Sequence, residues 1–107
     1  HPGDIVPLLI KQIQDPQRQV PKIQNVSGGL QQSMSLANLS AWCAERIGSH
    51  GVQPDLAPRP FDIPWLVLDS GLVSKNWDWS PRTPLESVLE EISKHARENP
   101  GWLEMTA

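Results

Sequence analysis

The spacing of apolar residues divides this chain into four helical stretches. In the first stretch the apolar positions are Ile5, Leu8, Leu9 and Ile13. Their three-to-four-residue period is that of an amphipathic helix. Asp4 has the side chain of an N-cap, and Pro7 falls in the first turn, where a missing N–H is tolerated. We therefore predict a helix that starts at Asp4 and ends near Asp15.

Two further helices are indicated in the middle of the chain. The apolar positions of the first of them are Leu36, Leu39, Trp42, Cys43 and Ile47. Ser35 is placed to cap its start, and Gly48 is placed just past its end, as helix termini prefer. After an irregular connection, Asp69 is expected to cap a short helix that runs to about Trp77.

The last helix carries the strongest local signal in the sequence. Its apolar positions are Leu85, Val88, Leu89, Ile92 and Ala96. Thr83 and Glu86 have the spacing of a capping box, with Pro84 at the first helical position. On the outer face Glu90 is expected to pair with Lys94, one turn further on. We predict that this helix ends at Asn99.

Two segments have the composition of short strands, residues 22–26 and 63–68. The second is a continuous apolar run, which suits a strand covered on both faces, and Pro64 implies either an edge position or a strand that begins just after it. Two short strands make a poor sheet alone, so they would be more secure against a sheet supplied by another part of a protein. The predicted fold class is α/β, a small mixed α+β domain with four helices and two or more short strands.

Size and composition set the remaining limits. The 107 residues form one domain, residues 1–107, which should bury roughly two-thirds of its unfolded surface. A net charge of −3 without a basic cluster argues against a nucleic-acid partner. The single cysteine, Cys43, lies in an apolar run, so we expect a buried thiol and a reducing, cytoplasmic setting. No stretch has the length of a membrane span or the pattern of a signal peptide. The start at His1, with a helix almost at once, suggests a piece of a longer polypeptide, although trimming gives the same start.

The most informative residues for chemistry are Arg59 and Asp62. Prolines on both sides of Arg59 restrict its backbone, so less ordering is needed when a ligand binds. A guanidinium fork suits two phosphate oxygens, and a carboxylate can accept hydrogen bonds from two ribose hydroxyls. Spacing alone, however, favours a surface arginine near an unrelated loop aspartate. The three histidines are scattered, so no metal site is expected.

Several segments stand in a recognisable order along the chain. They are His1-Pro2-Gly3-Asp4, Asn25-Val26-Ser27-Gly28-Gly29, Ser33-Met34-Ser35-Leu36, Arg59-Pro60-Phe61-Asp62, Asp69 and Trp79-Ser80-Pro81. Together they resemble the extended short-chain dehydrogenase/reductase family, whose members epimerise or dehydrate nucleotide-diphospho sugars. The glycine loop followed by Ser-x-Ser-Leu is most similar to the CDP-paratose (CDP-tyvelose) 2-epimerase branch.

The resemblance implies a division of labour between two domains. An N-terminal Rossmann domain would hold NAD(P) and a catalytic Tyr-x-x-x-Lys pair, and this chain would be the C-terminal substrate domain. Arg59 and Asp62 would then bind the nucleotide-diphospho sugar. Because the chain has no tyrosine and no GxGxxG loop, we expect neither a catalytic residue nor a bound cofactor in it. The alternative is a stand-alone, non-catalytic binding or interaction module of the same architecture.

Three details of the resemblance concern the local structure of the chain. The glycine loop either approaches a phosphate or only makes a turn, and we favour the turn. Trp77 and Trp79 either stack on a base or close a core, and we favour the core. Asp78 stands where the family prefers glycine, so the turn there is expected to differ slightly, because aspartate tolerates a left-handed backbone less readily.

Overall fold

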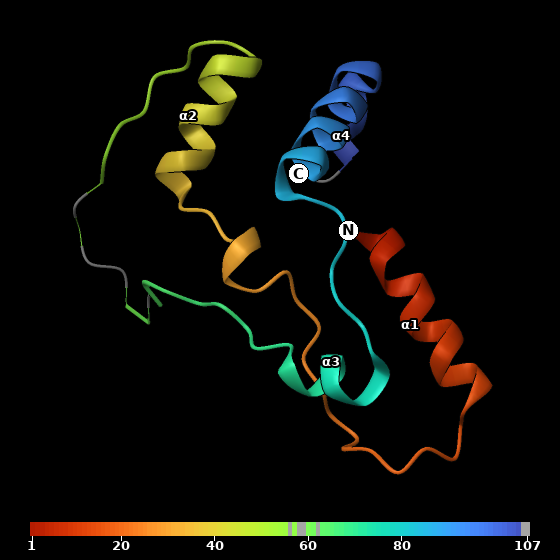
Figure 1. Cartoon of the computed structure of the whole chain (residues 1–107). Coiled ribbons are helices and arrows are strands. Elements are labelled where there is room, and N and C mark those ends of the chain that lie inside the picture. The colour runs from red at the N-terminus through yellow and green to blue at the C-terminus, as the bar shows by residue number, and fades with distance from the viewer. Residues whose placement is uncertain (56, 58–59, 62, 106–107) are drawn as a thin grey trace.

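The computed structural model describes residues 1–55, 57, 60–61 and 63–105, with side chains up to residue 102. The helices are α1 (Pro2–Gln14), α2 (Leu36–Arg46), α3 (Gly71–Trp77) and α4 (Leu85–Glu98), with 3-10 turns η1 (Leu30–Gln32) and η2 (Pro100–Met105). Long connections join them, and the chain that leaves α2 runs along the outside of the molecule, on the side away from α1 (Figure 1). The four predicted helices are therefore confirmed.

The α/β fold predicted from the sequence is wrong, because the described part of the chain is helical and forms no strand. Residues 22–26 and 63–68 run as irregular chain without a β-ladder. Their composition suits a strand only where a neighbouring backbone lies at pairing distance, and none does here. The two segments meet instead at their ends, through the side chains of Ser27 and Ser70.

The hydrophobic core lies between α1, α3 and the chain that follows each of them. Its buried members are Leu8, Val73, Trp77 and Trp79, with Ile5, Val20 and Val26 packed against it. Both tryptophans are only 6% exposed, so their predicted core position is confirmed. The core is small, and it positions α1 against α3 but does not reach α2.

Helices α2 and α4 contact each other through polar groups. Arg46 of α2 forms ion pairs with Glu86 and Glu90 of α4, and the Trp42 indole donates a hydrogen bond to Glu86. Glu90 thus pairs with Arg46 of α2 and not with Lys94, the partner that the sequence predicted. The apolar positions of α2 remain largely uncovered. Leu36 and Ile47 are exposed and Cys43 is half-buried, so the predicted buried thiol is not found.

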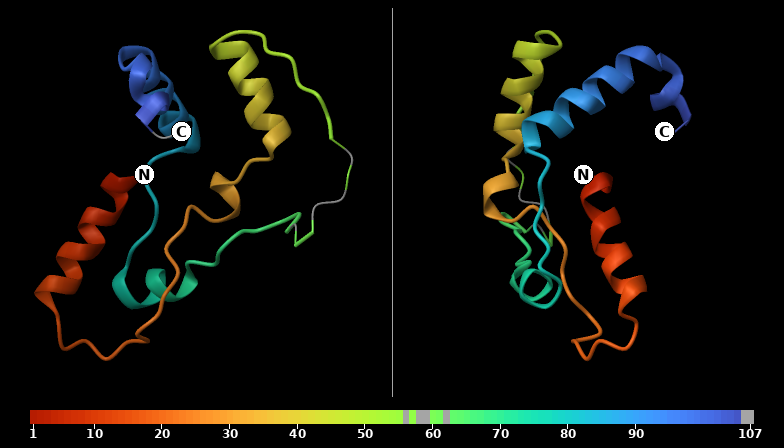
Figure 2. Two further views of the ribbon diagram at one scale, coloured as in Figure 1. Left: turned by 180° about the vertical axis from the view of Figure 1, so that it is seen from behind. Right: turned by 45° about the vertical axis from the view of Figure 1, so that its right-hand side comes forward.

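The resulting shape is open. The radius of gyration is 17.8 Å, compared with about 13 Å for a compact chain of this length. The accessible surface of 9015 Å² exceeds the roughly 5,900 Å² of a compact monomer of this mass. The chain buries about half of its unfolded surface and not the expected two-thirds. Figure 2 shows the separation of the helices from two further sides.

The helices begin close to the predicted positions, but not all of the predicted residues cap them. His1, and not Asp4, caps α1, because its Nδ1 accepts a hydrogen bond of 3.0 Å from the Gly3 N–H. The predicted Ser35 cap of α2 is confirmed by a 3.1 Å bond from the Asn38 N–H to the Ser35 hydroxyl. Gly48 follows the end of α2 with a φ of 153°.

Asp78 ends α3 in the left-handed conformation, with φ 48° and ψ 52°. Glycine adopts this conformation without steric cost, and aspartate is one of the few other residues that do so at moderate cost. Lys11 of α1 reaches this turn and donates hydrogen bonds to the carbonyls of Trp77 (2.7 Å) and Asp78 (2.8 Å). A cation at the C-terminal end of α3 satisfies carbonyls that lack helical partners.

Replacing Asp78 should reveal the cost of its backbone conformation. Asp78→Gly is expected to raise the free energy of unfolding by about 0.5–1 kcal/mol, because it removes the Cβ from a left-handed residue. Asp78→Val should lower it by about 1–2 kcal/mol. Urea unfolding followed by tryptophan fluorescence measures both changes.

Asp15 provides the matched control for this experiment. It also follows a helix, but its φ of −132° lies in the ordinary region, so Asp15→Gly should give no stabilisation. Finding Asp78→Gly no more stable than Asp15→Gly would contradict the proposed strain.

Candidate functional site

The two predicted substrate-binding residues, Arg59 and Asp62, lie outside the described residues. Of their neighbours, Pro60 is exposed, and the Phe61 side chain is fully exposed on a residue with a φ of 65°. The pairing of Arg59 with Asp62 therefore stays a prediction. The structure does describe where the chain goes after them, since residues 63–70 lead directly into α3.

This following segment is fastened to the glycine loop by three residues, Ser27, Leu68 and Ser70, which we call the serine clasp. The Ser27 hydroxyl donates to the Leu68 carbonyl (2.6 Å), and the Ser27 N–H donates to the Ser70 hydroxyl (2.9 Å). The Ser70 hydroxyl donates back to the Ser27 carbonyl (3.0 Å). Both hydroxyl protons are thereby used within the protein. The clasp joins two motif segments that stand about forty positions apart.

The glycine loop itself makes a turn, in agreement with the preferred interpretation. The Gly29 N–H donates to the Ser27 hydroxyl (3.1 Å) and so is not offered to a ligand. A Cβ on Gly28 would come within 2.5 Å of the Gln32 Cβ, so glycine is required for this close approach. Gly29 has a φ of 65°, which also favours glycine.

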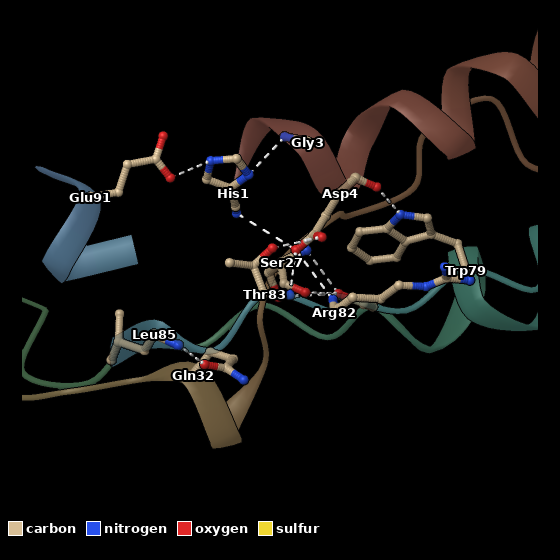
Figure 3. Close-up of polar contacts among 11 residues, drawn as sticks. His1, Gly3, Asp4, Ser27, Gln32, Trp79, Arg82, Thr83, Leu85 and Glu91 are labelled. Carbon is tan, nitrogen blue, oxygen red and sulfur yellow. Dashed lines mark hydrogen bonds and ion pairs between the residues drawn. The ribbon is translucent and has the colours of Figure 1, made fainter. Parts of the chain in front are cut away.

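Asp4 joins α1 to the segment that precedes α4. Its Oδ2 accepts hydrogen bonds from the N–H groups of Thr83 (3.1 Å) and Arg82 (3.2 Å), and its Oδ1 accepts from the Thr83 hydroxyl (3.0 Å). Its backbone carbonyl accepts from the Trp79 indole at 2.6 Å (Figure 3). The bond from the Thr83 N–H, aided by the other donors, lowers the pKa of the Asp4 carboxyl below its ordinary value.

The predicted capping box at the start of α4 is absent, because the N–H of Thr83, which Glu86 would accept in such a box, is donated to Asp4. Thr83 gives its hydroxyl to Asp4, and the N-cap is Pro84, which has no side-chain cap. Gln32 of η1 fills the position instead, since its Oε1 accepts a hydrogen bond from the Leu85 N–H. At α3, Asp69 accepts from the Gly71 N–H (2.8 Å) although the N-cap residue is Ser70.

Three of the motif segments, residues 1–4, 25–29 and 79–81, contribute to the lining of a cavity of about 250 Å³, which we call the inner cavity. It is lined by His1, Asp4, Ile5, Val26, Ser27, Gly28, Gln32, Trp79, Pro81, Thr83, Leu85 and Val88. Its polar groups are largely occupied with one another: the Nε2 of His1, for example, pairs with Glu91 at 3.0 Å (Figure 3). The inner cavity is thus a place where these segments are joined to one another by hydrogen bonds.

A second cavity of about 260 Å³ lies beside the segment that follows Asp62 in the sequence, and we call it the Trp65 cavity. It is lined by Ser33, Met34, Ser35, Asn38, Pro64, Trp65, Leu66 and Val67. Sequence reasoning missed it, because Trp65 was assigned to a covered strand. The exposed position of Trp65 could have been inferred from the adjacent Pro64 and from the lack of a second strand long enough to cover it.

The titratable residues form no metal centre in the described ranges. No group of three or more His, Cys, Asp or Glu side chains there is arranged to hold a metal ion. His50 bonds to the Ser40 hydroxyl (2.8 Å), and His95 packs edge-on against Trp102 with ring centres 5.3 Å apart. The helices of the described chain are all too short or too polar to traverse a lipid bilayer.

Comparison with known proteins adds no assignment. No family model, no curated protein and no solved structure matches this chain.

The Asp4 junction should weaken in acid. A carboxylate whose pKa is lowered by folding contributes stability above its ordinary pKa of about 4, and that contribution is lost as the pH falls through the lower folded value. The urea midpoint of the parent should therefore fall between pH 5 and pH 2 more steeply than that of Asp4→Asn, which has no such proton to bind.

Asp15→Asn serves as the control for this titration, because Asp15 is exposed and its carboxylate pairs with the Arg18 guanidinium at 3.5 Å and with no other side chain of the described residues. It should keep most of the pH dependence of the parent. Equal slopes for the parent and Asp4→Asn would show that the junction does not depend on the charge of Asp4.

Proposed function

We propose that this chain is the substrate-recognition domain of an NAD-dependent nucleotide-sugar epimerase or dehydratase. The observation that carries the proposal is the convergence of the motif segments. Ser27 of the glycine loop bonds to Ser70, beside Asp69, and Asp4 bonds to Thr83 and Trp79. Segments that resemble one family in sequence order also contact one another in space, which supports their origin as one functional set.

The ligand would be held by Arg59 and Asp62. The guanidinium of Arg59 matches a diphosphate, because it can donate two parallel hydrogen bonds to phosphate oxygens. Asp62 would accept hydrogen bonds from the two ribose hydroxyls. The serine clasp supports this assignment, since it fixes the far end of the segment that follows Asp62.

The chemistry would come from a partner domain of Rossmann type that carries NAD(P). By resemblance, the sugar would be oxidised transiently and then epimerised or dehydrated before hydride returns. This chain would position the nucleotide and move no proton, in keeping with its lack of tyrosine. Its open shape and large accessible surface support a covering domain. We place the assembled protein in the reducing cytoplasm because of its single half-buried cysteine.

A nucleotide titration tests this function directly. CDP, UDP and dTDP should bind the isolated chain with a dissociation constant near millimolar, equivalent to about 4 kcal/mol, because only part of the pocket is present. Chemical-shift changes in the NMR spectrum of the chain measure such binding. The absence of binding by all three nucleotides would reject nucleotide recognition.

Arg59→Ala should weaken this binding by about 1.5–3 kcal/mol, because a hydrogen-bonded charge pair to phosphate is lost. For the isolated chain that loss would move binding out of the measurable range. Arg82→Ala is the matched control, since the exposed Arg82 uses its backbone N–H and not its guanidinium at the Asp4 junction. If Arg59→Ala binds as tightly as Arg82→Ala, Arg59 is not the diphosphate ligand.

A further inference from the structure

We propose that the Trp65 cavity is the subsite for the nucleobase of the bound nucleotide, with the base stacked on the Trp65 indole. This inference rests on the proposed function and extends it to residues that the resemblance does not assign. Three properties of the cavity support it: an aromatic platform that the fold does not use, a size suited to one ring system, and a lining without charge.

Trp65 is 68% exposed. The other four tryptophans have structural contacts: Trp42 bonds to Glu86, Trp77 and Trp79 are in the core, and Trp102 packs against His95. Trp65 is thus the one tryptophan with a largely open face, and that face borders a cavity. Stacking of a base on such a face is favourable for any base, because every base has a π-surface.

The size of the Trp65 cavity limits what it can hold. Its 260 Å³ falls just below the range of about 300–1,000 Å³ that is typical of pockets for drug-sized ligands. A complete nucleotide-diphospho sugar would not fit, whereas a single planar base would. The ribose and the diphosphate must therefore lie outside it.

The chemistry of the lining leads to the same assignment. It contains no lysine, arginine, histidine or carboxylate, so nothing in it compensates the charge of a phosphate. It does contain Asn38, whose carboxamide both donates and accepts. Within the described residues neither this carboxamide nor the backbone amides of Trp65, Leu66 and Val67 make a hydrogen bond. Unused donors and acceptors beside a flat apolar face match the edge of a nucleobase.

The position of the cavity along the chain is compatible with one continuous ligand. Trp65 follows Asp62 by three residues, so covalent geometry keeps their Cα atoms within about 11 Å. A ribose is bonded directly to its base, and a carboxylate assigned to the ribose must lie close to the base subsite. The sequence distance satisfies this condition.

Trp65 should therefore act on nucleotides but not on their phosphate part alone. Trp65→Ala is expected to weaken UDP and CDP binding about tenfold, the effect of losing one stacked base. Binding of inorganic pyrophosphate should be unchanged. Trp65→Phe, which keeps an aromatic face, should retain most of the affinity while abolishing the quenching of tryptophan fluorescence that UDP causes in the parent.

Ile23→Ala is the control, because Ile23 is apolar, 86% exposed and absent from the cavity lining. It should bind nucleotides and pyrophosphate as the parent does. Asn38→Ala provides a second variant in case Trp65→Ala fails to fold, and it should weaken the binding of both UDP and CDP, because the base edge loses the hydrogen-bonding groups of the carboxamide.

The outcomes separate this inference from the proposed function. If Arg59→Ala abolishes UDP binding while Trp65→Ala and Asn38→Ala bind like the parent, nucleotide recognition stands and the base subsite is rejected. If glucose 1-phosphate quenches Trp65 and UDP does not, the cavity holds the sugar and the inference is also rejected. If neither UDP nor pyrophosphate binds the parent, both proposals fail together.

Discussion

The fold depends on one carboxylate. Asp4, in the first turn of α1, accepts three hydrogen bonds from Arg82 and Thr83, and its carbonyl accepts the Trp79 indole N–H. These bonds join two segments nearly eighty positions apart and set the direction in which the chain enters α4. The consequences extend further, because the Thr83 N–H is given to Asp4 and so is not available to Glu86 at the start of α4, where Gln32 accepts the Leu85 N–H instead. The bonds to Asp4 thus join α1 to the segment before α4, and the Gln32 bond joins η1 to the start of α4.

Polar contacts join most of the molecule, and apolar packing is confined to the small core between α1 and α3. The serine clasp connects the glycine loop to α3, and Arg46 connects α2 to α4. Hydrogen bonds are directional but contribute only about 1 kcal/mol each, so they fix relative positions more than they add stability. Much apolar surface remains uncovered, including Val6, Leu9, Ile10 and Ile13 on one face of α1. In the proposed assembly, the partner domain would cover this apolar surface.

Helices could be predicted from the sequence because their hydrogen bonds and their apolar period are local. The strands could not, because residues 63–68 have strand composition but no partner backbone at pairing distance. The capping box failed for a similar reason: Thr83 and Glu86 had the right spacing, but Asp4 and Arg46 took them from other parts of the chain. The Trp65 cavity was also beyond sequence reasoning, since it requires Asn38 of α2 and Trp65 to lie together. The features that could not be predicted from the sequence are therefore mainly contacts between polar residues that lie far apart along the chain.

The contact between α2 and α4 has a consequence for ionic conditions. Arg46, Glu86 and Glu90 each keep about half of their side-chain surface in solvent, so each of these ion pairs contributes at most about 1 kcal/mol, and less as the salt concentration rises. Helix α2 also supplies one wall of the space next to Trp65, through Asn38. Raising the ionic strength is therefore expected to weaken the hold of α4 on the helix that forms this wall.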